Sequence, residues 1–180
     1  MKLIIKMKCF CPQITQINTD EKYHMNKIVI TGGCGFVGVN LIDYLQKEKN
    51  NTQIVVLDNE SLGKRQYLDE FDGLEFVYGD IKNKELVFQV LENTDAVVHL
   101  AADTRVLDSV ADPTKNFDVN VVGTFNILNA VREHSIPLLV NASTGGAILG
   151  NVEPPVHEGM VPEPNPLTGP PSLLWKDIVL

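Results

Sequence analysis

The period of apolar and polar positions changes repeatedly along the chain from Lys27 onward. Short runs rich in Val, Ile and Leu alternate with longer segments in which apolar residues recur every three or four positions. Five short runs predict strands: Lys27 to Thr31, Gln53 to Leu57, Leu74 to Tyr78, Ala96 to Leu100 and Pro137 to Asn141. Because strands that alternate with helices form βαβ units, the pattern predicts an α/β fold, a doubly wound parallel sheet of Rossmann type.

Three segments predict the helices that cover this sheet. Phe36 to Glu48 and Lys84 to Leu91 each place their apolar side chains on one stripe. Pro113 to His134 predicts a longer helix, with proline near its start, that packs along the sheet.

The same patterning divides the chain into three parts. Residues 1–25 show no sustained period and predict a loose extension, whereas residues 26–150 carry the alternation and predict one domain. Residues 151–180 predict a loop or tail, because seven of the ten prolines fall between Pro154 and Pro171 and proline lacks the backbone donor that helices and strands need.

Composition excludes several classes of protein. With 180 residues, 44% of them hydrophobic, and a formal net charge of -8, the chain has the profile of one globular domain and shows no basic face for nucleic acid. No apolar run approaches the roughly 18 residues of a membrane span. The three cysteines are Cys9, Cys11 and Cys34; without a disulfide or metal-ligand framework they favour reduced thiols, no metal and a cytoplasmic location.

A glycine-rich segment directly follows the first predicted strand. Gly32, Gly35 and Gly38 have the spacing G-x-x-G-x-x-G at the mouth of a predicted helix. In a dinucleotide site such glycines serve the turn, the close approach to a pyrophosphate and the contact of helix with strand. The alternative is a plain tight turn, which three glycines in register disfavour.

Asp58 ends the second predicted strand, twenty residues beyond Gly38. At that spacing a carboxylate accepts hydrogen bonds from the adenosine ribose and repels a 2'-phosphate, which favours NAD over NADP. The nearby cations Lys64 and Arg65 weaken this preference. The alternative is that Asp58 only ends the strand or caps the next helix.

Six motifs together resemble one known family. They are Thr31-Gly-Gly-Cys-Gly-Phe-Val-Gly38, Asp58-Asn-Glu-Ser-Leu-Gly-Lys-Arg65, Gly79-Asp-Ile81, His99-Leu-Ala-Ala102, Asp118-Val-Asn-Val-Val-Gly-Thr124 and Asn141-Ala-Ser-Thr-Gly-Gly-Ala-Ile-Leu-Gly150. The set resembles the sugar-nucleotide epimerase and dehydratase branch of the extended short-chain dehydrogenases, and most of all the UDP-glucose 4-epimerases. The resemblance covers about residues 26–168. It implies an NAD-binding domain at 26–150, a UDP-sugar as the substrate, and reversible hydride transfer at a sugar carbon.

The resemblance also implies contacts with NAD. They fall on Phe36 and Val37 at the pyrophosphate, Asp58 and Asn59 at the ribose, Asp80 and Ile81 beside the adenine, Leu100, Ala101 and Ala102 along the cofactor groove, and Asn120 below the nicotinamide half. Each has a plainer alternative. Packing alone explains the apolar residues, Asp80 would cap a helix, and Asn120 would be satisfied within its helix surroundings. His99 is interpreted as a partly buried residue at a strand end.

The catalytic part of the resemblance is incomplete. It implies that Thr144, with Ser143 as its substitute, hydrogen-bonds the reacting sugar oxygen, and that a Tyr-x-x-x-Lys motif supplies the base. All four tyrosines precede Ser143, and Ser172 stands four residues before Lys176. A serine hydroxyl is too weak an acid to replace a phenol without a neighbouring base. We therefore expect a chain that ends before the C-terminal substrate lobe and is catalytically incomplete.

Three functional hypotheses remain open at this point. The first is the NAD-binding portion of a sugar-nucleotide epimerase or dehydratase. The second is a pseudoenzyme or regulatory module in which NAD controls association with another protein. The third is a chain that aggregates through an open sheet edge. Homodimerisation is an open alternative as well.

Overall fold

The computed structural model describes residues 25–48, 51–105, 108, 111–143, 153, 157 and 160. Nearly all of the predicted extension and tail therefore lies outside the described residues, and so do residues 144–150 of the predicted domain.

Five strands form one parallel sheet in the order β3-β2-β1-β4-β5. The strands are β1 (Lys27–Thr31), β2 (Gln53–Asp58), β3 (Leu74–Tyr78), β4 (Ala96–His99) and β5 (Leu138–Asn141). The chain builds β1, β2 and β3 outward in one direction and then crosses back, so that β4 pairs with β1 on its other side. This reversal confirms the predicted doubly wound sheet.

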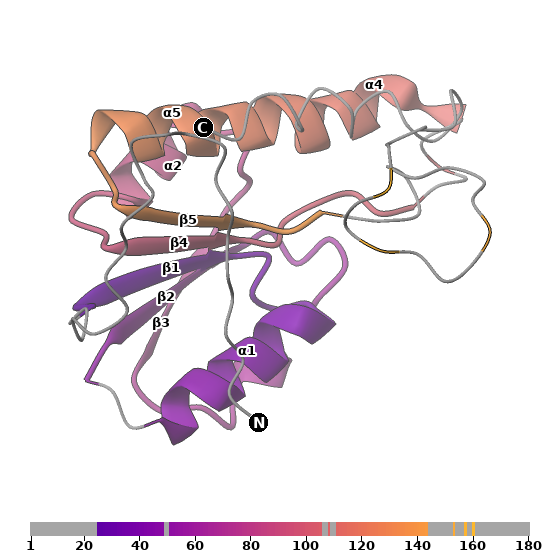
Figure 1. Ribbon diagram of the computed structural model, residues 1–180. Helices are drawn as coiled ribbons and strands as arrows, with labels where there is room; N and C mark the ends of the chain where they lie inside the picture. The colour runs from indigo at the N-terminus through magenta and orange to yellow at the C-terminus, as the bar shows by residue number, and fades with distance from the viewer. Residues whose placement is uncertain are drawn as a thin grey trace.

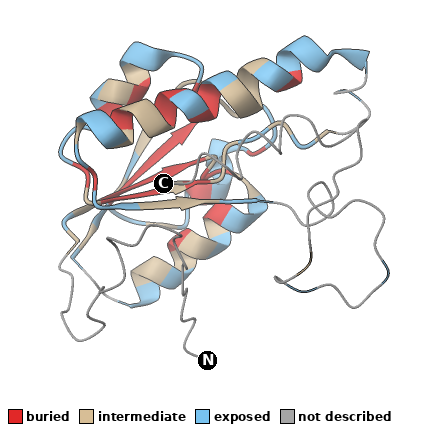
Figure 2. Ribbon diagram, turned by 45° about the horizontal axis from the view of Figure 1, so that its top comes forward, coloured by how far each residue is buried: buried red, intermediate tan, exposed pale blue. Residues whose placement is uncertain are grey.

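Helices cover both faces of the sheet (Figure 1). Helix α1 (Phe36–Lys47) lies on one face, and α2 (Lys84–Val90), α4 (Pro113–Phe117) and α5 (Thr124–Glu133) lie on the other. Successive side chains of β1 alternate between two apolar clusters, with Ile28 and Ile30 on the α1 side and Val29 on the other. Figure 2 shows the buried strands between these helical layers.

Two of the helices begin at a side-chain cap. Asn83 Oδ1 accepts a hydrogen bond from the amide of Leu86 at 3.1 Å and so starts α2. Asp112 does the same for the amide of Lys115 at 3.2 Å, with Pro113 as the first residue of α4. Helix α1 differs, because no side chain of the described residues caps its amino terminus at Gly35.

The prediction of one continuous helix over residues 113–134 is wrong in one respect. A π-helical segment, η2 (Asp118–Gly123), separates α4 from α5. Its hydrogen bonds span five residues instead of four, a feature often found at functional sites. Asn116, Asn120 and Thr124, spaced four residues apart across this segment, all bind residues that end or follow β4.

The remaining predicted boundaries agree closely with the structure. Strands β1 and β3 coincide with their predictions, β2 extends one residue further to Asp58, and β4 ends at His99 instead of Leu100. A short 3-10 helix, η1 (Arg65–Leu68), follows β2. Over the described ranges, none of the helices is both long and apolar enough to cross a bilayer.

Candidate functional site

The glycine loop (residues 32–38) connects β1 to α1 and contacts the segment after β4. Gly32 has a positive φ of 70°, and a Cβ built there would lie 2.6 Å from the amide nitrogen of Ala101. A side chain at this position would therefore be both strained and overlapped with backbone. Gly32 makes the predicted turn and brings the ends of β1 and β4 into contact.

The first turn of α1 lies directly on the glycine loop. A Cβ at Gly38 would be 2.5 Å from the Cα of Gly33. The close contact at Gly38 is therefore between the helix and its own loop, whereas the glycine spacing predicts contact between helix and strand. Phe36 and Val37, which begin the helix, are 86% and 60% exposed. Uncapped amides at the positive end of a helix dipole are suited to bind a phosphate group.

Asp58 lies against the same loop. The residue is 8% exposed; Oδ2 accepts a hydrogen bond from the Cys34 amide at 3.0 Å and Oδ1 accepts one from the Glu60 amide at 2.7 Å. It ends β2, but it caps no helix, since η1 begins only after Lys64. Each carboxylate oxygen has a second lone pair for a further donor.

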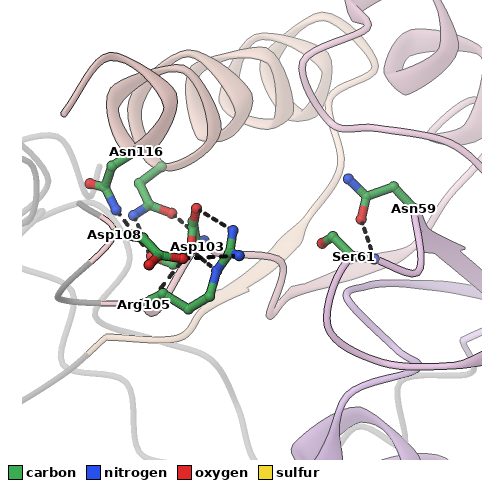
Figure 3. Close-up of polar contacts among 7 residues, drawn as sticks. Asn59, Ser61, Asp103, Arg105, Asp108 and Asn116 are labelled. Carbon is green, nitrogen blue, oxygen red and sulfur yellow. Dashed lines mark hydrogen bonds and ion pairs between the residues drawn. The ribbon is translucent and has the colours of Figure 1, made fainter. Parts of the chain in front are cut away.

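Asn59 and Asp80 join the carboxyl ends of β2 and β3. Asn59 Nδ2 donates to Asp80 Oδ2 at 3.0 Å, while Asn59 Oδ1 accepts from the Ser61 amide at 3.0 Å (Figure 3). The alternative role of Asp80 as a helix cap is wrong, because Asn83 caps α2. Ile81, the residue predicted to lie next to Asp80 at the adenine, is 4% exposed and belongs to the core.

The cations Lys64 and Arg65 lie near Asp58 in sequence but have partners of their own. Lys64 Nζ donates to the carbonyl of Glu60 at 3.3 Å, and the Arg65 guanidinium lies 5.0 Å from the ring centroid of Phe76. The carboxylate of Asp58 forms no ion pair within the described residues. Its negative charge is therefore not neutralised by a direct ion pair.

The β4 loop (residues 100–105) forms the other side of the site. Leu100 packs against the apolar cluster on the α1 side and Ala101 against the opposite cluster, so packing accounts for both, whereas Ala102 is exposed. The amide of Leu100 donates to the Thr31 carbonyl at 3.0 Å and fixes the loop to β1.

Side chains of the α4 and η2 helices fix the far end of this loop. Asn120 accepts a hydrogen bond from the Asp103 amide at 2.8 Å and donates to its carbonyl at 2.9 Å, and Asn116 donates to the same carbonyl at 3.2 Å. The side chain of Asn120 is thus hydrogen-bonded to the β4 loop. The plainer alternative, that it is satisfied within its helix surroundings, is wrong. Figure 3 shows this cluster across from Asn59.

Asp103 and Arg105 form a two-bond ion pair within the β4 loop. Arg105 Nε lies 3.0 Å from Asp103 Oδ1, and its second nitrogen lies 3.0 Å from Oδ2. These hydrogen bonds hold the pKa of the Asp103 carboxyl below its usual range. The charge of Asp103 is therefore neutralised locally, and Arg105 also contacts Asp108 at 3.1 Å.

His99 is not the partly buried residue that its place in the sequence predicts. Its side chain is 3% exposed and lies between two hydroxyl groups, with Nδ1 2.6 Å from Thr31 Oγ1 and Nε2 2.8 Å from Thr124 Oγ1. Burial lowers the pKa of His99 to about 4. The imidazole is therefore neutral at physiological pH.

Ser143, one of the two predicted catalytic hydroxyl residues, follows β5 and is exposed. The amide of Ala142 donates to the His99 carbonyl at 3.1 Å, which places Ser143 at the same edge of the sheet as the β4 loop. Thr144, the preferred residue, lies outside the described residues.

Sequence reasoning missed four of the polar residues that shape this edge. They are Thr31, Asp103, Thr124 and Asn126, whose Nδ2 donates to the carbonyls of Ile81 and Lys82 at 3.0 and 3.1 Å. Thr31 was detectable, since it stands directly before Gly32 at the end of a strand. In the described part of the chain, no group of three His, Cys, Asp or Glu side chains is placed to bind a metal ion.

Comparison with known proteins agrees with the family resemblance seen in the sequence. Residues 28–170 match the model of the NAD dependent epimerase/dehydratase family. A dTDP-glucose 4,6-dehydratase of Mycobacterium tuberculosis is 40% identical over 114 residues, which cover 62% of this chain and 34% of the relative. The chain thus spans about a third of that relative's length.

Two solved structures share the fold. A UDP-glucose 4-epimerase of Thermus thermophilus in complex with NAD has a TM-score of 0.76 and 33% identity, over 84% of this chain and 49% of that one. The UDP-glucose 4-epimerase of Thermotoga maritima with UDP-glucose has a TM-score of 0.75 and 29% identity, over 84% and 50%.

Proposed function

The chain belongs to the NAD dependent epimerase/dehydratase family, and from that premise we propose that it binds NAD at the carboxyl edge of the sheet. The observation that supports this most directly is the 3.0 Å hydrogen bond from the Cys34 amide to Asp58 Oδ2. It joins the glycine loop, which is shaped for a phosphate, to the carboxylate that is suited to a ribose. Both lie where the strand order reverses between β1 and β4, the usual ligand position in open parallel sheets.

The residues of this edge fit the two ends of the cofactor. The uncapped amino terminus of α1 would hold the pyrophosphate, and the remaining lone pairs of Asp58 would accept hydrogen bonds from the adenosine ribose. Asn59 and Asp80, joined at 3.0 Å, would border the adenine. When bound, NAD supplies the group that accepts and returns a hydride.

We further propose that the cofactor is NAD and not NADP. The Asp58 carboxylate is unpaired by any cation in the described residues, and Lys64 and Arg65 are directed at the Glu60 carbonyl and the Phe76 ring. A 2'-phosphate would thus meet the negative charge of Asp58, which no ion pair among the described residues neutralises.

The proposed substrate class is a nucleotide sugar, on the strength of the family and of the relatives named above. The reaction itself is a narrower proposal. Ser143 lies at the carboxyl edge, but no tyrosine follows it in the sequence. We expect the 180-residue chain to bind NAD without epimerising UDP-glucose at ordinary enzymatic rates.

Thermal unfolding with increasing cofactor tests the binding proposal. A ligand that binds only the native state adds about 2.7 kcal/mol of stability at a concentration roughly one hundred times its Kd. We expect the midpoint to rise with NAD and to rise much less with NADP. An unchanged midpoint at millimolar NAD would remove the proposal, and equal shifts with both cofactors would remove the preference for NAD. A turnover assay with UDP-glucose tests the reaction separately.

A further inference from the structure

His99 connects three elements that border the proposed site. It ends β4 and pairs in register with Thr31, the last residue of β1. Its ring nitrogens lie 2.6 Å from Thr31 Oγ1 and 2.8 Å from Thr124 Oγ1 at the start of α5. All three side chains are buried, with exposures of 3%, 0% and 7% for His99, Thr31 and Thr124. The imidazole therefore lies at a defined position between β1, β4 and α5.

The two hydroxyl groups provide partners for both nitrogens of the ring. A neutral imidazole has one N–H donor and one acceptor nitrogen, and a threonine hydroxyl can donate or accept, so each ring nitrogen has a partner in either tautomer. Thr31 Oγ1 also accepts a hydrogen bond from the Ala101 amide at 3.4 Å, which connects it to the β4 loop. Loss of either hydroxyl would leave a buried ring nitrogen unsatisfied, which is unfavourable.

Thr31 and Thr124, the two partners of His99, each lie next to residues that shape the loops of the site. Thr31 directly precedes Gly32, whose missing Cβ would lie 2.6 Å from the Ala101 nitrogen. The glycine loop and the β4 loop are therefore in direct backbone contact, and a shift of one displaces the other. Thr124 lies four residues after Asn120, which holds Asp103 of the β4 loop at 2.8 and 2.9 Å.

We propose that His99, through its hydrogen bonds to Thr31 and Thr124, is a positioning residue that sets the separation of the glycine loop and the β4 loop and thereby the affinity for NAD. The inference rests on the proposed function, since NAD is the ligand whose binding it governs. His99 acts through backbone and contacts no ligand itself.

The test compares NAD affinities of full-length variants by calorimetric titration. Thr31→Val and Thr124→Val keep the side-chain shape but leave one ring nitrogen without its partner. We expect each to weaken NAD binding about 5- to 30-fold, the effect of losing one buried hydrogen bond. Thr31→Ser and Thr124→Ser restore the hydroxyl, and we expect their Kd to stay within about twofold of the parent value.

A second histidine provides the matched control. His134 Nε2 lies 2.9 Å from the Phe88 carbonyl, and the two rings pack edge to face with centroids 5.8 Å apart. His134 follows α5 at its carboxyl end, away from the glycine loop. We expect His134→Leu to lower the thermal midpoint without changing the Kd for NAD.

The outcomes separate this inference from the proposed function. Absence of NAD binding by the parent chain would overturn both. Tight binding by the parent, with Val variants that lose only thermal stability as His134→Leu does, would overturn the positioning role alone. Nitrogen-15 shifts of the imidazoles in the parent chain give a further check should a variant fail to fold. His99 nitrogen shifts typical of a ring without hydrogen-bond partners would also overturn the inference.

Discussion

Asn120 binds Asp103 at both ends of its backbone: Oδ1 accepts from the Asp103 amide at 2.8 Å, and Nδ2 donates to the Asp103 carbonyl at 2.9 Å. One side-chain amide thereby satisfies the two polar groups that a strand neighbour would satisfy in a sheet. The β4 loop is fixed to the η2 segment by this pair, although it has no regular structure of its own.

Replacing Asn120 with Leu should release the Asp103 backbone. Both hydrogen bonds are lost, and the local opening free energy should fall by about 1–2 kcal/mol, so the Asp103 amide should exchange with solvent deuterium about 5- to 30-fold faster. Asn40→Ala is the control, because Asn40 donates only to the Phe36 carbonyl of its own helix. Equal exchange at Asp103 in the parent and in Asn120→Leu would contradict this account.

Gly32→Ala should cost far more stability than Gly73→Ala. Both glycines have φ near 70°, so both substitutions carry the left-handed strain of about 1–2 kcal/mol. At Gly73 no described atom lies within 4 Å of the added methyl group, whereas at Gly32 backbone of Ala101 lies at 2.6 Å. Overlap should add a further 1–3 kcal/mol or so, roughly the cost of overpacking. Urea denaturation of both variants measures the difference, and equal losses would show that the loops do not touch.

Asp58→Asn should weaken NAD binding, whereas Asp95→Asn should not. Each carboxylate accepts two backbone hydrogen bonds, Asp58 from Cys34 and Glu60, and Asp95 from Asn26 and Lys27 at the opposite edge of the sheet. Each change should lower stability by about 1–3 kcal/mol. Only Asp58→Asn should raise the Kd for NAD and reduce the discrimination against NADP. Matching losses of affinity in both variants would indicate a general effect of destabilisation.

Acid should destabilise the fold through His99. Its pKa is about 4 in the folded chain, against an ordinary value of 6.5, because burial disfavours the charged ring. Folding therefore favours the neutral ring. The stability that this preference contributes is fully present above pH 6.5. As the pH falls toward about 4, the unfolded chain binds a proton that the native chain excludes, and about 3 kcal/mol of stability is lost.

His99→Gln separates this effect from that of other titrating groups. Glutamine does not titrate, so the free energy of unfolding should change less between pH 6.5 and about 4 in the variant than in the parent. Chemical denaturation at several pH values in this range provides the measurement. Parallel curves for the two proteins would exclude His99 as the source.

Cys34 should resist thiol reagents until the chain unfolds. Its side chain is 1% exposed, and burial, with contributions from Asp58 and Glu60, raises its pKa to about 12. At a pH of about 8 the reactive thiolate is therefore scarce. In a Cys9→Ser, Cys11→Ser background, labelling with a maleimide should follow the unfolded fraction as urea is added. Rapid labelling in native buffer would contradict the buried placement.

Local patterning predicted the sheet, and it drew attention to the glycine loop and to Asp58. Strand runs reveal themselves by β-branched residues, and the interval from Gly38 to Asp58 is a property of one βαβ unit. In the structure Asp58 contacts the glycine loop through the amide of Cys34, which lies 24 residues away in sequence.

The features that sequence did not reveal depend on distant partners. His99 contacts Thr31 and Thr124, which lie 68 and 25 residues away, so neither its burial nor its hydrogen-bond partners follow from neighbouring residues. The π turn at residues 118–123 is equally invisible to a period of three or four. Asn120, whose bonds to Asp103 cross 17 residues, could be noticed as polar but not assigned a partner.

The adjacency of β1 and β4 has a consequence for the order of folding. Thr31 and His99 are register partners although 68 residues separate them in sequence, so this pairing closes a longer stretch of chain than the pairings of β1 with β2 or β2 with β3 do. Closing a longer stretch costs more chain entropy. During synthesis the first three strands leave the ribosome well before the fourth, so the proposed NAD site stays incomplete until His99 has emerged.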